Sequence, residues 1–468
     1  MPPACNHTSL NYESSLHADD IGFHRPTAQQ RATGAGKKKQ DTDEGLKQTF
    51  PAPLVLPGDD LSSDTRCPPQ SLLSWVREKK RNQVTPGRNV VYCAASPDIQ
   101  PGVNFVHSWT KPQIQGNVGT TSASNKSTDV PSPDAKHVLE YLEAFYHGMN
   151  VKMLPPGLLR FTRCDDADPS SFRAKANLKE PKYIGLTTVT ETVGIRTRAS
   201  KDGIFKCQLN LDDLLDTAIS ILPDDAYALL MLVGHDLFED EDDDFCCGRA
   251  YGGSRVAVVS TARYNPSLDD RQDVEREHAW PASHCDAYMR ESCGAPSKTK
   301  KAKPGFSDSH QTPLQAAVSA HVALPSPRTL SQLSSLWLSR VCQTASHELG
   351  HCFAMDHCVY YACVMQATAS LAEDVRQPPY LCPVDLAKML RATGADERDR
   401  YEALLMFCRR HTDGRAGWFE AFAAWIAGRL RELEKGDEGL EKDSADLLSK
   451  PISKGKAGSK SVPIQLSP

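Results

Sequence analysis

The run His347–His351, with the letters HELGH, and the following His357 constrain this chain more than any other stretch. On an α-helix, residues four apart project from the same face, one turn above the other. His347 and His351 can therefore offer two neutral imidazoles to one Zn²⁺, and Glu348 can reach a metal-bound water. A third histidine six residues after the second makes a chance origin rare. The pattern predicts an active-site helix that carries a catalytic metal.

Three histidine ligands and one open position describe a catalytic zinc site, because a structural site normally closes all four positions with protein groups. Zinc lowers the pKa of a bound water toward neutrality and polarises a carbonyl. Glu348 can then remove the proton and deliver it to the leaving amine, which predicts a zinc metallopeptidase. The alternative is a non-catalytic, zinc-stabilised binding module. A purely structural site has no use for Glu348, so we favour the peptidase.

A cysteine cluster follows the histidines directly: Cys358 and Cys363, then Met365, then Cys382-Pro383-Val384-Asp385. This order resembles the archaemetzincin family of zinc peptidases, whose core motif is HExxHxxGxxH, then CxxxxC, a methionine and a distal CxxC. A weaker likeness covers roughly residues 205–265. There, residues 248–256 resemble the family's strand pair ahead of the active-site helix.

The resemblance implies a role for each matched residue. The implied ligands of the catalytic zinc are His347, His351 and His357, with Glu348 as the general base. Met365 matches the methionine of the turn beneath the metal. Three thiols match ligands of a second, structural zinc: Cys358, Cys363 and Cys382. Two zinc ions per chain are therefore expected.

This chain departs from the family pattern at two positions. Ala354 stands where the family has glycine, in a turn that must reverse sharply to bring His357 to the metal, so we expect a left-handed backbone there. Asp385 stands where the family has the fourth cysteine. A carboxylate oxygen can bind zinc at about 2.0–2.2 Å, so Asp385 is a candidate ligand. It could instead cap the helix that begins near Leu386.

Composition indicates one catalytic domain with long polar additions. The 468 residues include 40% hydrophobic residues and 32 prolines, and the mean hydropathy is −0.46. Residues 1–66 and 436–468 are rich in small polar and charged residues and are expected to be disordered extensions. Residues 67–435 should form the catalytic domain, with low-complexity insertions at about 113–134 and 290–315. A helix followed by a buried strand is typical of an α/β (α+β) fold, and the resemblance implies a metzincin-like zincin with a mixed twisted sheet and an active-site helix.

Periodicity places several elements of this domain. Apolar residues at helical spacing predict one long helix over 330–353 and another that Asp134 caps. The apolar run 226–233 has the length of a buried strand. Residues 246–261 indicate a hairpin broken at Gly252-Gly253. The resemblance places one strand of this hairpin at the sheet edge above the active site, where an extended peptide could add as a further strand.

Charge and cysteine content limit the partners and the compartment. The net charge of −5 offers no basic field for nucleic acid or an anionic membrane. No window approaches eighteen consecutive apolar residues, and Met1–His7 lacks a signal pattern. Fifteen cysteines fit free thiols and metal ligands better than a disulfide framework. We expect an intracellular protein, cytoplasmic or nuclear, that acts on a peptide or protein. The resemblance hints at cleavage from a free N-terminus, and the oligomeric state is not predicted.

A further metal site is imaginable at His278, His284 and Cys285. These residues lack a partner pair at suitable spacing, so the sequence does not favour metal binding there. The surrounding insertion is expected to be a flexible surface element.

Overall fold

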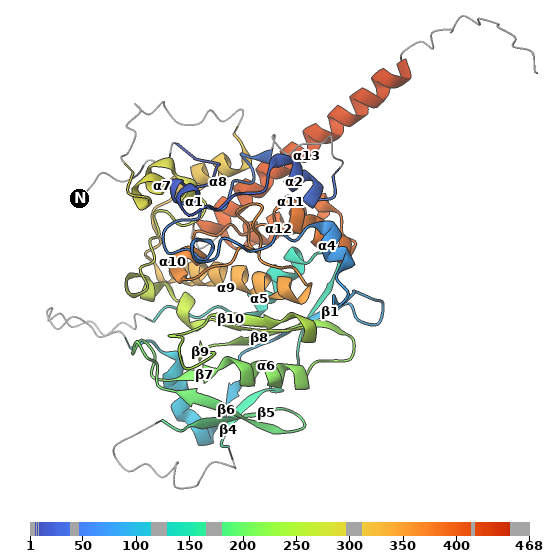
Figure 1. Ribbon diagram of the computed structural model, residues 1–468. Coiled ribbons are helices and arrows are strands. Elements are labelled where there is room, and N and C mark those ends of the chain that lie inside the picture. Colours follow the sequence, from blue (N-terminus) through green and yellow to red (C-terminus); the bar gives the residue numbers. More distant parts are fainter. Residues whose placement is uncertain are drawn as a thin grey trace, which may run out of the picture.

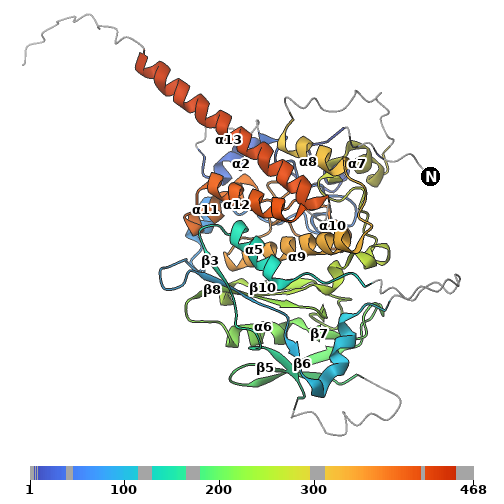
Figure 2. The same ribbon diagram turned by 180° about the vertical axis from the view of Figure 1, so that it is seen from behind.

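The structure is a computed structural model that describes residues 5, 7, 9–37, 46–113, 129–164, 180–295, 311–412 and 417–449, with side chains up to residue 435. It contains two mixed β-sheets and a group of helices. Figures 1 and 2 show the helices α9 and α5 on one face of the first sheet and α6 on the other. The predicted mixed α/β class is confirmed, although the sequence indicated a single sheet.

The five-stranded sheet has the order β10-β11-β8-β1-β3. Its strands are β1 (Val90–Ala94), β3 (Asn150–Met153), β8 (Ala226–Val233), β10 (Gly248–Tyr251) and β11 (Val256–Ser260). Four strands run parallel, and β10 pairs antiparallel with β11 at the edge. All eight residues of β8 are buried, because elements cover both faces of this central strand. The predicted buried strand and the predicted hairpin are both confirmed.

The six-stranded sheet has the order β2-β4-β5-β6-β7-β9. Its strands are β2 (Asp98–Ile99), β4 (Arg160–Thr162), β5 (Tyr183–Thr187), β6 (Thr192–Arg198), β7 (Gln208–Asn210) and β9 (Asp236–Phe238). The pairs at its two ends are parallel and the inner pairs antiparallel. The helix α6 (Leu211–Ser220) shares one hydrophobic core with strands of both sheets, so this core joins the sheets.

The long helix α9 (Leu330–Cys352) confirms the prediction and supports the histidines. It begins at a capping box in which Thr329 and Gln332 satisfy each other's backbone N–H groups. Residues spaced four apart are buried along one face: Trp337, Val341, Ala345 and Leu349. Arg340, on the same helix, forms a buried two-pronged ion pair with Asp269 at 2.7 and 2.9 Å. The helix is therefore fixed along its length before it reaches the site.

Figures 1 and 2 show most of the other helices on the same side of the first sheet as α9. They are α4 (Leu72–Arg77), α5 (Ala135–Phe145), α7 (Asp286–Ser292), α8 (Pro313–Val322), α10 (Leu371–Asp374), α11 (Pro383–Thr393), α12 (Glu397–Arg410) and α13 (Trp418–Ser449). Short 3-10 turns complete the chain: η2 (Pro101–Thr110), η3 (Gly252–Ser254), η4 (Ala262–Tyr264), η5 (Pro266–Arg271) and η6 (Ala282–His284). Asp134 caps α5, as predicted, by accepting from the Lys136 N–H. No helix in the part of the chain that the structure describes is long and apolar enough to cross a membrane.

The disorder expected over residues 1–66 is wrong for most of that segment. Residues 9–37 and 46–66, called here the N-terminal strap, form α1 (Leu16–Asp20), α2 (Ala28–Gly34) and α3 (Asp60–Ser63). Figure 1 shows α1 and α2 on the side of the molecule that holds α8 and α13. Phe23, Val55 and Leu61 are buried together with the distant Val359. This small core is completed by one residue about 300 positions away, a contact that a local pattern does not reveal.

The predicted C-terminal tail is also partly helical, because α13 continues to Ser449. The remaining tail, 450–468, lies outside the described residues. The central parts of the two predicted insertions, 114–128 and 296–310, lie outside them as well.

Candidate active site and metal centres

The structure brings His347, His351 and His357 together. The first two come from the last turns of α9 and the third from the loop after it, and their ligand atoms lie within 4.8 Å of one another. The Nε2 atoms of His347 and His351 are 3.1 Å apart. Their Nδ1 atoms lie 2.6 Å from the Val364 carbonyl and 2.8 Å from the Met355 carbonyl. These carbonyls accept an N–H from Nδ1, which leaves each Nε2 as a lone-pair donor aimed at one point.

The electrostatics of the triad suit a dipositive metal. Burial lowers the pKa of His347 well below its ordinary value, and the neighbouring imidazoles lower it further. Burial also lowers the pKa of His351 to about 4, with His357 contributing. Both imidazoles are therefore neutral at neutral pH, the form that binds zinc. The donor set fits a zinc ion held by three nitrogens.

Two close contacts explain why glycine occupies positions 350 and 252 near the triad. A Cβ at Gly350 would lie 2.5 Å from Met365 Sδ, so only glycine lets this buried methionine pass beneath the helix. Met365 thus packs against α9 at Gly350, between the two helical histidines. A Cβ at Gly252 would lie 2.4 Å from the His351 carbonyl oxygen, so the hairpin turn packs directly against the end of α9.

The turn after α9 has the predicted backbone. Ala354 has φ 58°, in the left-handed region, which confirms the expectation made at this position. The Ala354 carbonyl accepts from Gln70 Nε2 at 3.0 Å, and Gln70 Nε2 also donates to Asp356 at 2.9 Å. The strained turn is therefore held from outside by a side chain that precedes α4.

The triad forms part of the wall of a cavity of about 860 Å³. Glu348 lines the same cavity, with only 8% of its surface exposed. Burial raises the pKa of Glu348 to about 8, and the nearby Asp374 carboxylate adds to this, while Arg249 opposes it. One side of the cavity consists of residues 244–250, which lead into and include most of β10. The hairpin strand at the sheet edge is thus beside the candidate active site, as expected.

A second cluster lies entirely in the interior. Cys358, Cys363, Cys382 and Asp385 are all buried, and their ligand atoms lie within 4.8 Å of one another. Cys358 Sγ and Cys382 Sγ are 3.6 Å apart. Asp385 Oδ2 accepts from Cys382 Sγ at 3.3 Å and from Cys363 Sγ at 3.5 Å. Three sulfurs and one oxygen therefore surround a common point.

Asp385 does not cap its helix. The N-terminus of α11 at Cys382 has no side-chain cap hydrogen bond. The other oxygen of Asp385 accepts from Lys388 Nζ at 2.8 Å, and the same ammonium donates to Gln70 Oε1 at 2.8 Å. Burial raises the pKa of Asp385 to about 7, with Cys358 contributing and Lys388 opposing. The capping interpretation is wrong, and the geometry leaves Oδ2 facing the thiols.

Sequence reasoning missed Gln70 and Lys388. Lys388 lies three residues after Asp385 on a helix, a spacing that signals an ion pair and could have been noticed. Gln70 carries no such signal, because its partners Ala354 and Lys388 are 284 and 318 positions away.

A helix with two histidines one turn apart, a glutamate beside the first and a third histidine after a turn is the arrangement of the HExxH class of metallopeptidases. Residues 319–391, which include both clusters, match Peptidase family M54. By this match and by sequence similarity, the chain is a distant homologue of the archaemetzincins.

The relatives are remote. Archaemetzincin-2 of Macaca fascicularis is 25% identical over 282 residues, which is 60% of each chain. Archaemetzincin-2 of Homo sapiens is 26% identical over 58% of this chain and 57% of its own length. This chain therefore spans less than two thirds of the length of these relatives. The crystal structure of archaemetzincin from Methanopyrus kandleri is 16% identical and covers 67% of this chain and 99% of its own, with a TM-score of 0.30.

Proposed function

We propose that this protein is a zinc-dependent peptidase with a metzincin-like catalytic core and a preference for free peptide N-termini. One observation carries the peptidase assignment: the three imidazoles of His347, His351 and His357 converge beside Glu348 at an open cavity. A structural zinc site would be closed by protein groups on all sides.

The residues divide the chemistry between them. Bound by the three histidines, zinc would lower the pKa of a water and polarise the scissile carbonyl. Glu348 takes the proton of the attacking water and delivers it to the leaving amine. Val364 and Met355 hold the first two imidazoles through their carbonyls and so fix the direction of both lone pairs. The burial of Glu348 strengthens its interaction with any positive charge in the cavity.

The position of the edge strand β10 is evidence that the substrate is a peptide. One edge of β10 is paired with β11, and β10 is the last strand of its sheet. An extended peptide can pair with a free strand edge through main-chain hydrogen bonds, which position its backbone without regard to sequence. A peptide so bound would pass the histidines, since Gly248, Arg249 and Ala250 line the same cavity.

The charge of the cavity supports the preference for a free N-terminus. Besides Glu348, its walls carry several carboxylates, those of Asp60, Glu239, Asp244, Asp356 and Asp374. Among the described lining residues, Arg249 is the one lysine or arginine, and it is paired with Glu239. An acidic cavity favours the ammonium group of a peptide N-terminus over a carboxylate terminus.

We also propose that Cys358, Cys363, Cys382 and Asp385 hold a second, structural zinc. The four donors close the site, and Lys388 neutralises the outward oxygen of Asp385. An oxygen is a harder ligand than a thiolate, so this zinc should be chelated more readily than one held by four cysteines.

A peptide library tests the function. With zinc present, we expect hydrolysis that a chelator abolishes and added zinc restores. N-acetylation of a cleaved peptide should lower kcat/KM by about 10- to 100-fold, because it removes a charged hydrogen bond of about 1.5–3 kcal/mol. Equal cleavage of acetylated peptides would overturn the N-terminal preference alone. A protein that retains zinc yet cleaves no peptide would favour the non-catalytic binding module.

A further inference from the structure

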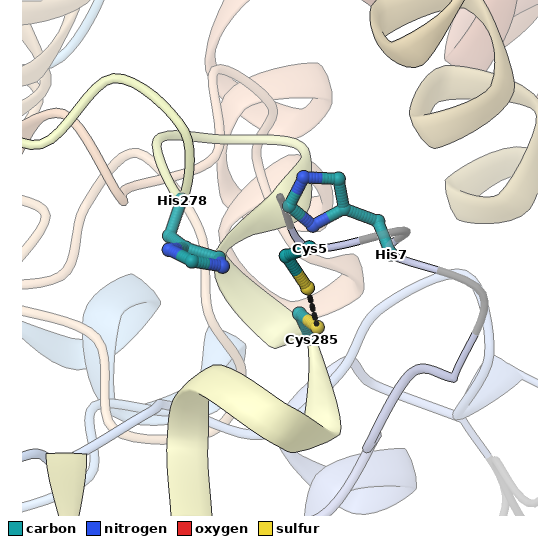
Figure 3. A group of neighbouring side chains, drawn as sticks. All are labelled: Cys5, His7, His278 and Cys285. Atoms are coloured by element: carbon teal, nitrogen blue, oxygen red, sulfur yellow. Dashed lines mark hydrogen bonds between the residues drawn. The ribbon is translucent and has the colours of Figure 1, made fainter. Parts of the chain in front are cut away.

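A third group of metal-binding side chains lies away from both clusters. Cys5 and His7 come from the beginning of the chain, and His278 and Cys285 come from the segment that leads into α7. Their ligand atoms lie within 4.8 Å of one another, and Cys5 Sγ is 3.3 Å from Cys285 Sγ. Figure 3 shows the two thiols adjacent and the two imidazoles beside them. The sequence analysis considered His284 together with His278 and Cys285 but did not favour a metal site there, and His284 Nε2 lies 2.9 Å from the Ala52 carbonyl.

Two buried nitrogens in this group have no hydrogen-bond partner among the described residues. They are His7 Nδ1 and His278 Nε2, on side chains with 5% and 7% of their surface exposed. An unsatisfied buried polar atom costs about 1–3 kcal/mol, so native proteins rarely leave two together. A disulfide between Cys5 and Cys285 would leave both nitrogens unsatisfied. A metal ion would satisfy both.

The other nitrogen of His278 is already committed. His278 Nδ1 lies 2.8 Å from Glu275 Oε1. A carboxylate in this position fixes the ring and leaves Nε2 as the ligand atom, as it does for histidines that bind zinc. The ring also stacks on Tyr288 with centroids 4.2 Å apart, so its orientation is fixed on two sides.

The backbone holds the two segments together on both sides of the group. Cys5 N–H donates to Glu277 Oε1 at 2.8 Å. Further along, Asp286 N–H donates to the Ser9 carbonyl and Asn11 N–H to the His284 carbonyl, both at 2.9 Å, and Leu10 pairs with Cys285. The four donors are thus brought together by backbone N–H hydrogen bonds that do not depend on a metal.

We propose that Cys5, His7, His278 and Cys285 form a structural Cys₂His₂ zinc site. Two thiolates and two neutral imidazoles give zinc its usual tetrahedral donor set, and their charges cancel that of the ion, which suits a buried position. All four positions are filled by protein, so the site stabilises rather than catalyses. It ties the beginning of the chain to α7, next to the N-terminal strap whose Asp60 lines the candidate active site.

Metal analysis of the full-length protein tests this site independently of peptidase activity. We expect one zinc fewer per chain in Cys5→Ser, His7→Ala, His278→Ala and Cys285→Ser than in the parent protein. His278→Cys should keep the zinc, because it replaces one ligand with another. Cys293→Ser is the matched control: this cysteine ends α7 outside the group and should leave the zinc content unchanged.

Cobalt substitution locates the ion if a variant folds poorly. The Cys382→Ser variant keeps Cys5, His7, His278 and Cys285 intact, so with cobalt it should show thiolate-to-cobalt charge-transfer absorption from this group. Adding Cys5→Ser to this variant should remove that absorption. Two outcomes would overturn the proposal: an unchanged zinc content in all four variants, or Cys5 and Cys285 recovered as a disulfide from freshly purified protein.

Discussion

The histidine triad opens onto a cavity of about 860 Å³, whereas the thiol cluster 358–385 is closed on every side. The exposed wall of the first leaves room for a substrate, and His357 is accessible. The second has four buried donors, with Lys388 sealing its carboxylate. Sites only one residue apart in the chain, at His357 and Cys358, can thus serve opposite purposes. The two sites differ in whether solvent and substrate can reach them, and not in ligand type alone.

One side chain joins the two sites. The Gln70 amide donates to the Ala354 carbonyl in the turn between His351 and His357, and its oxygen accepts from Lys388, the partner of Asp385. Gln70 therefore links the turn of the histidine site to the ion pair beside the thiol cluster. Loss of the proposed structural zinc should disturb the turn that positions His357.

The largest effect should come from Glu348, which gives the open site its chemistry. Glu348→Gln keeps the size of the side chain but removes the base, so turnover should fall by a factor on the order of 10² or more. The zinc content should remain that of the parent, because the variant changes no proposed ligand. Hydrolysis at the parent rate would contradict the mechanism, and loss of zinc would show that Glu348 has a structural role instead.

The closed site should respond in stability rather than in chemistry. Asp385→Ala leaves Lys388 buried without its charged partner, which typically costs about 3–5 kcal/mol. Denaturant unfolding should show this loss, together with one zinc fewer per chain. Asp385→Cys should retain the zinc or bind it more tightly against a chelator. Unchanged stability and zinc content in Asp385→Ala would show that the carboxylate neither binds metal nor balances Lys388.

The buried carboxyl group of Glu373, next to the wall of the open site, should make stability depend on pH. Glu373 accepts from the N–H groups of Asp60 and Ala369, both of which line the cavity. Burial, with Asp59 adding to it, raises the pKa of Glu373 to about 8. Between the ordinary value of 4.5 and about 8, the folded state binds more protons than the unfolded state, so this group makes stability fall as pH rises.

Glu373→Gln should therefore gain stability relative to the parent as pH rises from about 5 to about 8. The gain should be at most about 3.5 kcal/mol, since one pKa unit corresponds to about 1.4 kcal/mol. Unfolding curves of both proteins across this range measure the difference. A constant difference at every pH would mean that Glu373 is ionised in the folded protein.

The sequence predicted the parts whose signals are local. The 23-residue helix α9 follows from apolar residues four apart, and β8 follows from eight consecutive apolar residues. The left-handed turn at Ala354 follows from the need to return the chain to the helix end. The histidine triad is local as well, because three ligands lie within eleven residues.

The parts that were missed depend on distant contacts. The N-terminal strap has few and irregular apolar residues, and its small cores need distant partners: Val359 joins Phe23, Val55 and Leu61, and Met289 joins Leu54 and Leu56. In the proposed third site, Cys5 and His7 supply half of the donors, and nothing in the sequence links them to His278 and Cys285 about 270 residues later. A pattern can reveal a complete site in one segment, but it cannot pair two half-sites across the fold.

The smallest effect tests the turn that links the open and closed sites. Alanine with φ 58° carries a cost of roughly 1–2 kcal/mol, which glycine avoids. Glycine also loses more conformational entropy on folding, which costs about 0.5–1 kcal/mol. Ala354→Gly should therefore stabilise the protein by about 0.5–1 kcal/mol net. Ala354→Val is the control and should destabilise, because a β-branched side chain is worse in this region. Unfolding with saturating zinc measures both variants. If Ala354→Gly clearly lost stability, the alanine methyl group would have to contribute more by packing than its backbone strain costs. The turn that links the two sites would then not be a source of net strain.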